Sequence, residues 1–573
     1  MHFRISALLC LFLAGTSLPA AAQDAGSLLR EQQRREDSLR PDRLPSVEDD
    51  ASAQERPVAG AQQGQTIVVR SLLFTGKVDI LPEKERARIA SAVQGHRLGI
   101  AGIKAIADTV TIAAQKEGRL LAFAVLPPQD ITEGVVRVEI REGHLSEKVV
   151  ERKGDVRARQ GRLEGLAAEL PADGVEKKDL EAILLRMNDH PGVTARARLM
   201  AGAAPQTSRL VIGVEQAPLF SASLWGDNAG SSSTGRAQAN GQFVLTDLSG
   251  YGDVTRFTTT VSEGQKFAQA AFSMPLGTGP LSFSANYGFL DYRNVDAVGS
   301  VLGLEGQAHY AGVGLDYSLV RSRDVNVRLT ADLDWKALID DSLVGRLQDK
   351  RVIAGTFGIA GDVRDDVLGG GLTSWSLGWT LGDLDLSRVP GAMAADEASL
   401  RTQGSFQTLN AQVSRLQALP GDLSLFGRVG AQWANKNLDS SQDFSLGGPY
   451  GVRGYPVGEG RGDMGVLGTL ELRYDAPVPD MWGALQFATF LDAGYVRLNR
   501  RSNGIAAASV CGCNDYGLAS AGVSARWSRE NLSFSAAWAH ALGSNPGRDR
   551  LTGENADGST RRHQFWLQGA IKF

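Results

Sequence analysis

The sequence predicts a transmembrane β-barrel preceded by two small α+β modules, and three features predict it. The chain ends in a stretch, 562–573, in which apolar residues alternate strictly with mostly polar ones up to a terminal Phe573. Its start, 1–22, has the basic, apolar and small-residue regions of a secretory signal peptide. Between them, alternating segments of about 10 residues, separated by polar turns, fill the second half.

Membrane crossing by helices is not expected after the signal peptide. No later apolar run approaches the ~20 residues that a spanning helix needs. Only helices and closed barrels satisfy every backbone polar group in lipid, so an exported chain of this kind crosses as a closed barrel. A soluble sandwich gives the same alternation with the polarity reversed. The signal peptide and the terminal Phe573 favour the barrel.

Composition and motifs argue against several functions. The 573 residues are too many for one ordinary domain, and the net charge of -4 argues against a nucleic-acid binder. The sequence shows no zinc-ligand spacing of histidines, no Gly-x-Ser-x-Gly elbow and no phosphate-binding loop. We therefore expect no enzyme activity, no metal and no cofactor.

The exported chain begins with a polar helix, which we expect at 23–40, followed by a linker at 41–65 that is rich in proline and acidic residues. Ser27 could cap the start of the helix, and Pro41 ends it. Its apolar residues are only Leu28, Leu29 and Leu39. The helix therefore has little to bury, and is either a solvated arm or a helix suited to a wet, charged pore.

Two copies of one β-α-α-β-β pattern follow, at 66–142 and 143–217. Each copy is longer than the ~40 residues below which a domain needs extra staples, so each predicts a small soluble module. The expected elements are 67–74, 82–93, 100–116, 121–126 and 135–140 in the first copy, and 145–150, 157–168, 175–188, 193–199 and 209–214 in the second.

The region 218–573 is predicted to form the barrel. Leu470, Leu472 and Tyr474 point to one face of their strand, while Glu471 and Arg473 point to the other. Charged residues keep to one register in this way, as the wall of a water-filled lumen allows.

Two cysteines remain after the signal peptide is removed. Cys511 and Cys513 lie in an expected loop, and an oxidising compartment would allow them to form a disulfide. Their one-residue spacing closes a small, strained ring. A metal site is the weaker alternative, because no further Cys or His ligands lie nearby in the sequence.

Three local motifs resemble the two-partner secretion transporters (TpsB proteins), the haemolysin and filamentous-haemagglutinin transporter family. Leu126–Ile131 (LPPQDI) is similar to a sequence motif of the family's first POTRA domain. Trp225–Gly235 is similar to the family's first barrel strand and the turn after it. Gly447–Tyr455 contains Val452, Arg453, Gly454 and Tyr455, which look like the tip of the long sixth extracellular loop. Phe490, Asp492 and Gly494 match the motif expected on a later strand.

The resemblance covers essentially the whole exported chain. It implies a plug helix at 23–40, a linker at 41–65, POTRA domains at 66–142 and 143–217, and a barrel of about sixteen strands at 218–573, with loop 6 folding inward at about 444–465.

The match between Arg453 and Asp492 can also be argued from chemistry. Asp492 belongs to the polar register of its strand, so its carboxylate points into the lumen, and a guanidinium suits a bidentate contact with it. Gly451 and Gly454 would permit a tight loop tip. Shielded from water, such a pair costs about 3–5 kcal/mol to break, and fully solvated it contributes about 0–1 kcal/mol. The alternative is two separately solvated charges.

By resemblance, the protein resides in the outer membrane of a Gram-negative bacterium with its POTRA domains in the periplasm. It would secrete one large TpsA-type exoprotein, recognised through an N-terminal TPS domain, without ATP. Outer-membrane lipid, lipopolysaccharide and the barrel-assembly machinery are its other expected partners, and nucleic acid is not one.

By resemblance, the two POTRA domains are expected to capture the exoprotein by strand addition at an exposed edge, with the recognition surface on the second domain. The residues assigned to that surface are Leu180, Leu184, Val193, Thr194, Ala195 and Arg196. Two other functions remain open. An assembly insertase would generally have more POTRA repeats and no plug helix, and a passive porin or receptor would leave the two modules unexplained.

Overall fold

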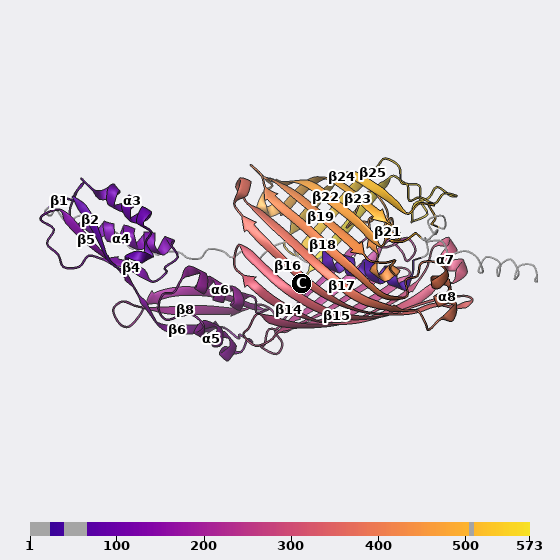
Figure 1. Cartoon of the computed structure of the whole chain (residues 1–573), viewed down its shortest axis with the longest axis horizontal. Helices are drawn as coiled ribbons and strands as arrows, with labels where there is room; N and C mark the ends of the chain where they lie inside the picture. Colours follow the sequence, from indigo (N-terminus) through magenta and orange to yellow (C-terminus); the bar gives the residue numbers. More distant parts are fainter. Residues whose placement is uncertain (1–22, 39–65, 503–508) are drawn as a thin grey trace, which may run out of the picture.

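The computed structural model describes residues 23–38, 66–502 and 509–573. The predicted signal peptide and linker lie outside these ranges. Two small modules lie at one end of the molecule and a large barrel at the other, with a helix inside the barrel (Figure 1). None of the helices in the described ranges is long and apolar enough to cross a membrane.

The barrel consists of sixteen antiparallel strands and closes where the last strand pairs with the first. This arrangement confirms the fold class predicted from the sequence. The strands are β9 (Phe220–Asp227), β10 (Gln238–Thr246), β11 (Val254–Val261), β12 (Gln265–Pro275), β13 (Leu281–Arg293), β14 (Glu305–Arg321), β15 (Val325–Ser342), β16 (Gly345–Asp365), β17 (Gly371–Asp385), β18 (Gly404–Ala418), β19 (Leu423–Ala434), β22 (Met464–Ala476), β23 (Ala484–Arg497), β24 (Asp515–Arg529), β25 (Leu532–Leu542) and β26 (His563–Lys572).

The alternation along each strand separates an apolar outer face from a polar lumen. In β26, Phe565 and Leu567 are 62% and 57% exposed on the outside, whereas Gln564 and Trp566 are buried inside. In β22, Leu470 and Leu472 are exposed while Glu471 is buried. The barrel is therefore apolar outside and polar inside, as a lipid environment requires.

Both modules contain a three-stranded sheet with two helices packed on it, and the first module has an additional pair of short strands, β1 and β3. The middle strand of each sheet comes last in sequence and pairs in parallel with the first strand and antiparallel with the other. The first module contains β1 (Ile67–Val68), β2 (Ser71–Gly76), α3 (Glu83–Val93), β3 (Arg97–Leu98), α4 (Ile100–Lys116), β4 (Ala122–Val125) and β5 (Val135–Glu142), and the second β6 (His144–Lys153), α5 (Gln160–Ala168), α6 (Lys177–Asn188), β7 (Val193–Ala201) and β8 (Thr207–Gln216).

Three further α-helices and one pair of short strands lie in the loops or the lumen of the barrel. The helix α2 (Ala25–Ser38) lies in the lumen, and α7 (Ala297–Leu302) and α8 (Pro390–Ala398) lie in loops at the end of the barrel away from the modules (Figure 1). The pair β20 (Phe444–Ser445) and β21 (Arg461–Gly462) belongs to the long segment between β19 and β22.

Polar contacts hold the second module against the turns at the near end of the barrel. Arg321 donates two hydrogen bonds of 2.7 Å to the carboxylate of Asp189. His190 Nε2 lies 3.2 Å from Asp247 Oδ2, and both side chains are buried. Burial alone would raise the pKa of the Asp247 carboxyl, but His190 and the amide of Gly252 outweigh it and lower the pKa below its usual value. The module thus meets the barrel at the mouth of the lumen.

Candidate functional site in the barrel lumen

The lumen helix α2 begins with a reciprocal cap. Asp24 Oδ1 accepts a 2.9 Å hydrogen bond from the amide of Ser27, and Ser27 Oγ accepts one of 3.2 Å from the amide of Asp24. Asp24 is therefore the capping residue, and the prediction that Ser27 caps the helix is wrong by one helical turn. Ser27 is instead the third residue of the helix, and its hydroxyl accepts the reciprocal hydrogen bond of a capping box.

The same helix buries more than its composition predicts. Leu28 and Leu29 are 2% and 0% exposed and pack against inward-facing side chains of β12 to β15. Those side chains are Phe267, Leu290, Tyr292, Ala308, Tyr310 and Leu338. The expectation that the helix has little to bury needs correction, because the lumen wall carries an apolar patch that these two leucines and Ala25 meet. Burying a leucine side chain typically contributes about 1.5–3 kcal/mol.

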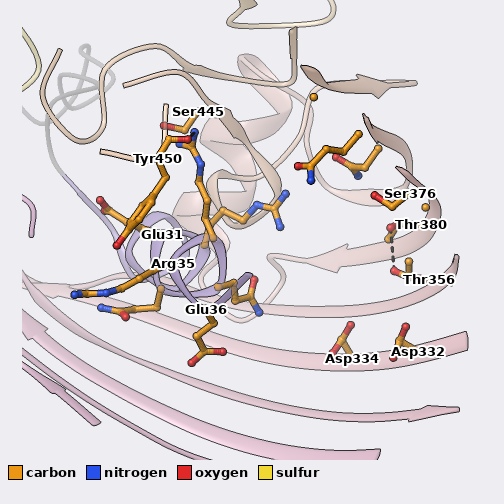
Figure 2. A pocket seen from close by; sticks show the side chains of 18 of the residues that line it. Glu31, Arg35, Glu36, Asp332, Asp334, Thr356, Ser376, Thr380, Ser445 and Tyr450 are labelled. Carbon is orange, nitrogen blue, oxygen red and sulfur yellow. Dashed lines mark hydrogen bonds between the residues drawn. The ribbon is translucent and has the colours of Figure 1, made fainter. Parts of the chain in front are cut away.

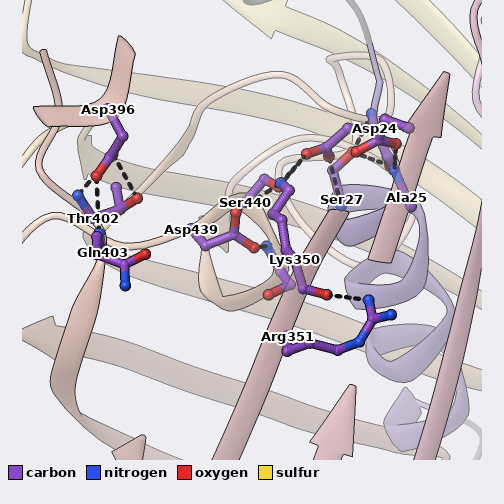
Figure 3. Close-up of polar contacts among 12 residues, drawn as sticks. Asp24, Ala25, Ser27, Lys350, Arg351, Asp396, Thr402, Gln403, Asp439 and Ser440 are labelled. Carbon is purple, nitrogen blue, oxygen red and sulfur yellow. Dashed lines mark hydrogen bonds and ion pairs between the residues drawn. The ribbon is translucent and has the colours of Figure 1, made fainter. Parts of the chain in front are cut away.

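A buried ion cluster, which we call the latch, holds the first turn of α2 (Figure 3). Lys350 Nζ lies 2.8 Å from Asp24 Oδ2 and 2.7 Å from Asp439 Oδ2, and the Lys350 side chain is only 3% exposed. Asp340 Oδ1 accepts a 2.8 Å hydrogen bond from the amide of Ala25. Carboxylates at a helix N-terminus are favoured by the helix dipole, and Lys350 balances their charge.

Later turns of α2 contact both the wall and loop 6. Arg35 pairs with Asp227 at the end of β9. Arg34 donates a 3.0 Å hydrogen bond to the carbonyl of Tyr450, and Glu31 lies 3.5 Å from Arg461. The helix and loop 6 therefore occupy the lumen as two contacting pieces.

Loop 6 comprises residues 435–463, the whole segment between β19 and β22, and so begins earlier than the predicted 444. Its base is the antiparallel pair of β20 and β21, and Gly447 and Val452 bridge across the tip. Val452 and Tyr455 are 0% and 2% exposed in a cluster with Leu446 and wall residues of β22 to β25. The loop tip is thus packed inside the barrel.

The structure brings Arg453 into contact with Asp492, and also with Glu471. Arg453 Nε and Nη2 each donate a 2.8 Å hydrogen bond to the Asp492 carboxylate, and Nη1 donates one of 2.7 Å to Glu471 Oε1. Asp492 is 0% and Arg453 8% exposed. Sequence reasoning did not include Glu471 in the site, although its inward register marked it as a candidate.

Three neighbouring residues fit the loop tip to the wall. The Arg453 guanidinium lies 3.4 Å from the centre of the Phe490 ring, a cation–π contact. A Cβ at Gly494 would lie 2.5 Å from Leu446 Cδ2, and one at Gly454 would lie 2.6 Å from Ser520 Cβ. These glycines are required by close approach of loop and wall, since neither has a positive φ.

A cavity of about 990 Å³ remains between α2, loop 6 and the wall. Figure 2 shows Glu31, Arg35 and Glu36 of α2 on one side and Asp332, Asp334, Thr356, Ser376 and Thr380 of the strands on the other. The strand residues labelled in Figure 2 are polar, while Phe283, Ile359 and Leu377 add apolar surface to the same wall. The lumen therefore keeps a wet space beside the helix even with both pieces in place.

The residues of the predicted recognition surface on the second module differ in exposure. Val193 and Ala195 are 6% and 5% exposed and belong to the hydrophobic core of the module, so their side chains point into that core. Thr194 and Arg196 lie on the exposed face of β7. Leu180 and Leu184 of α6 are partly buried against the same core.

Cys511 and Cys513 form a disulfide in the segment between β23 and β24. Cys511 is 4% exposed and packs in the same cluster as Val452 and Tyr455. In the described ranges, no three His, Cys, Asp or Glu side chains are grouped so as to hold a metal ion.

Comparisons with known proteins match nearly the whole chain. The family model described as "Haemolysin secretion/activation protein ShlB/FhaC/HecB" matches residues 206–538, and "POTRA domain, ShlB-type" matches 68–143. "Heme/hemopexin transporter protein HuxB" of Haemophilus influenzae (strain 86-028NP) is 26% identical over 97% of this chain and 96% of its own. "Outer membrane transporter CdiB" of Dickeya dadantii (strain 3937) is 24% identical over 82% of each chain.

Solved structures share the fold. CdiB from Escherichia coli superposes with a TM-score of 0.65 at 18% identity, covering 98% of this chain and all of that one. BamA from Haemophilus ducreyi lacking POTRA domains 1-3 gives a TM-score of 0.55 at 13% identity and covers 89% of this chain and 100% of its own. The family resemblance stated from the sequence is confirmed by these matches.

Proposed function

The chain belongs to the ShlB/FhaC/HecB family of haemolysin secretion/activation proteins and is an outer-membrane transporter of the two-partner secretion type, and from this we propose how it exports its exoprotein. Its POTRA domains lie in the periplasm, and its barrel spans the outer membrane. We propose that the exoprotein passes through the lumen in extended form after α2 has left it. Folding of the exoprotein outside then supplies the direction of movement, since the sequence contains no nucleotide-binding motif.

One observation carries this proposal: the lumen is filled by two separate pieces held differently. Loop 6 is anchored through buried guanidinium–carboxylate bonds to the wall and is joined to β19 and β22 at its two ends. The helix α2 is held by side-chain contacts alone: the latch, two leucines, and the contacts of its later turns with the wall and loop 6. A helix held in this way can leave while loop 6 stays. The space that it vacates adds to the cavity already lined by polar wall residues.

We propose that the exoprotein adds a strand to the free edge of β7, and that only the second half of this edge is available. The Asn188 side chain already bonds Ala195 at its amide (2.8 Å) and its carbonyl (3.1 Å). Backbone groups of Ala195 therefore point away from β8, and by the alternation of an antiparallel pair so do those of Ala197, Leu199 and Ala201. Strand addition would use Ala197–Ala201, which differs from the predicted residues.

Replacing Leu199 by proline tests this edge. Proline removes an N–H that faces away from β8, so the internal ladder keeps its bonds while the added strand loses one. Because a net backbone hydrogen bond contributes about 0.5–1.5 kcal/mol, we expect affinity for the exoprotein's N-terminal domain to fall about two- to tenfold. The control is Leu199→Ala, which keeps the N–H. Equal affinities of the two variants, measured by titration of the purified transporter, would contradict edge binding.

We further propose that the outer face of the barrel contacts lipid and lipopolysaccharide. Its exposed apolar outer residues, such as Phe565 and Leu567, would contact lipid acyl chains. Trp538, His540 and His563 form an outward ring cluster on β25 and β26 near the loop end, at the level where lipopolysaccharide head groups would lie. Insertion of the barrel would need the barrel-assembly machinery.

Deleting the gene tests the function as a whole. A dedicated transporter predicts that one large exoprotein disappears from the culture medium while the other outer-membrane barrels keep their levels. Quantitative proteomics of medium and outer membrane measures both. Loss of many barrels would indicate an insertase, and an unchanged set of secreted proteins would indicate a passive pore.

A further inference from the structure

A second cavity lies between the tip of loop 6 and the wall formed by β19, β22 and β24 to β26, and its lining is strongly basic. Its volume is about 330 Å³. The guanidinium groups that line it are those of Arg428, Arg453, Arg473 and Arg526. Among the described residues, Asp227 and Glu471 are the only carboxylates in its lining. We call this space the arginine cavity.

The positive charge of the arginine cavity exceeds what its carboxylates balance. Arg453 is matched by Asp492 behind it, and Asp227 is matched by Arg35 of α2. Two guanidinium groups, those of Arg473 and Arg526, then face the one remaining carboxylate, while Arg428 donates a 3.4 Å hydrogen bond to the carbonyl of Tyr450.

That carboxylate, Glu471, is already bonded by two guanidinium groups. Glu471 Oε1 accepts from Arg453 at 2.7 Å and Oε2 from Arg473 at 2.8 Å, while Arg526 Nη2 lies 3.9 Å away. Like charges confined within a partly dry cleft attract an anion from the solution.

Neutral donors converge on the same space from β24 and β25. Arg526 donates a 3.0 Å hydrogen bond to the neutral amide oxygen of Gln486, and its side chain is 45% exposed. Ser535 lies directly opposite Arg526 in the neighbouring strand. The hydroxyl of Ser524, two residues before Arg526, is buried and has no hydrogen-bond partner among the described residues. A guanidinium flanked by two hydroxyls suits an oxyanion.

The cavity lies where a chain arriving from the periplasm would first meet loop 6. Arg473 and Arg526 each lie three residues before the periplasmic end of their strands, at Ala476 and Arg529. Tyr450 and Gly451 of the loop tip border the same cavity. Anything bound here would therefore lie at the entrance to the lumen, next to the anchor of loop 6.

We propose that the arginine cavity is an oxyanion-binding site that takes carboxylate side chains of an acidic segment of the exported polypeptide. This inference rests on the proposed function, because it identifies the chemistry of the chain that enters the lumen. A bidentate carboxylate contact uses the fork of Arg526 without displacing Arg453. A bound carboxylate also competes with Glu471 for Arg473, so entry of the chain acts on the anchor of loop 6. A free phosphate has the same chemistry and is the alternative source.

Binding of a labelled peptide to the purified full-length protein in detergent tests the site. The probes are an aspartate-rich peptide, its asparagine counterpart and inorganic phosphate as competitor, with fluorescence anisotropy as the readout. We expect the aspartate peptide to bind roughly tenfold more tightly than the asparagine peptide, and Arg526→Gln to remove most of that difference. The matched control is Arg328→Gln, a lumen arginine that lines the larger cavity and lies 3.8 Å from Asp316.

Three results would overturn the assignment. These are equal binding of the two peptides, an Arg526→Gln variant that binds like the wild type, and an Arg328→Gln variant that weakens binding equally. Displacement of the peptide by phosphate at equal concentration would assign the site to a free anion. Heat-dependent electrophoretic mobility confirms that each variant is folded.

The binding assay contains no exoprotein, so its result does not depend on whether the proposed function is correct. Peptide binding that persists when the gene deletion removes no exoprotein would refute export and keep the site. Export without peptide binding would refute only the site.

Discussion

Replacing Arg453 by alanine is expected to abolish export while the barrel still inserts into the membrane. The change leaves the carboxylate of Asp492 buried without a guanidinium and leaves Glu471 with that of Arg473, and the two residues are 0% and 3% exposed. Removing one partner of a buried pair costs about 3–5 kcal/mol, which corresponds to a roughly 10²- to 4 × 10³-fold weaker docking of the loop tip. We expect less than about one tenth of the wild-type exoprotein in the medium, measured by quantitative immunoblot.

The Arg453 prediction has two controls. Arg346→Ala removes an ion pair of similar geometry, with Asp341, that lies in solvent at the hairpin between β15 and β16 and should leave export unchanged. Arg453→Lys keeps the charge but loses the fork, so its export should lie between wild type and Arg453→Ala. Normal export by Arg453→Ala, with the protein shown in the outer membrane, would refute the role of the anchor.

Periodicity in the sequence predicted which residues of a barrel strand share a face, and the signal peptide and Phe573 predicted which face is outside. The alternation around Phe565 and around Glu471 predicts the outward and inward registers that the structure has, because a side chain's direction in a strand depends only on its parity. The contact between Arg453 and Asp492 was predicted from a family motif. Alternation alone predicts that a charged side chain points into the lumen, but it does not predict which residue that side chain contacts.

The latch and the packing of α2 could not be predicted in this way. Lys350 meets residues 326 and 89 positions away in the chain, and no local pattern encodes such a contact. Phe267 and Leu338 break the polar inner register, which only the position of Leu28 and Leu29 explains. Similarly, the amide of Asn188 looks like an ordinary helix end in sequence, yet it closes half of the β7 edge.

Replacing Lys350 by methionine is expected to open the pore. The three carboxylates of Asp24, Asp340 and Asp439 would then lie close together in a buried site without a cation, and they would repel one another. When α2 leaves the lumen, Asp24 moves into water and the repulsion is relieved. With about 3 kcal/mol lost from the plugged state, the ratio of open to plugged protein rises roughly 100-fold. The mean conductance of the purified protein in planar bilayers should increase accordingly, while export continues because α2 must leave in any case.

Charge balance within the latch makes this prediction specific. Adding Asp24→Asn to Lys350→Met removes one of the repelling charges, so the double variant should conduct less than Lys350→Met alone. Lys436→Met is the matched control, since its Nζ bonds the carbonyls of Thr402 and Gln403 in a loop rather than the plug helix. Wild-type conductance in Lys350→Met, or an equal rise in Lys436→Met, would show that the leucine contacts and the later arginines hold α2 without the latch.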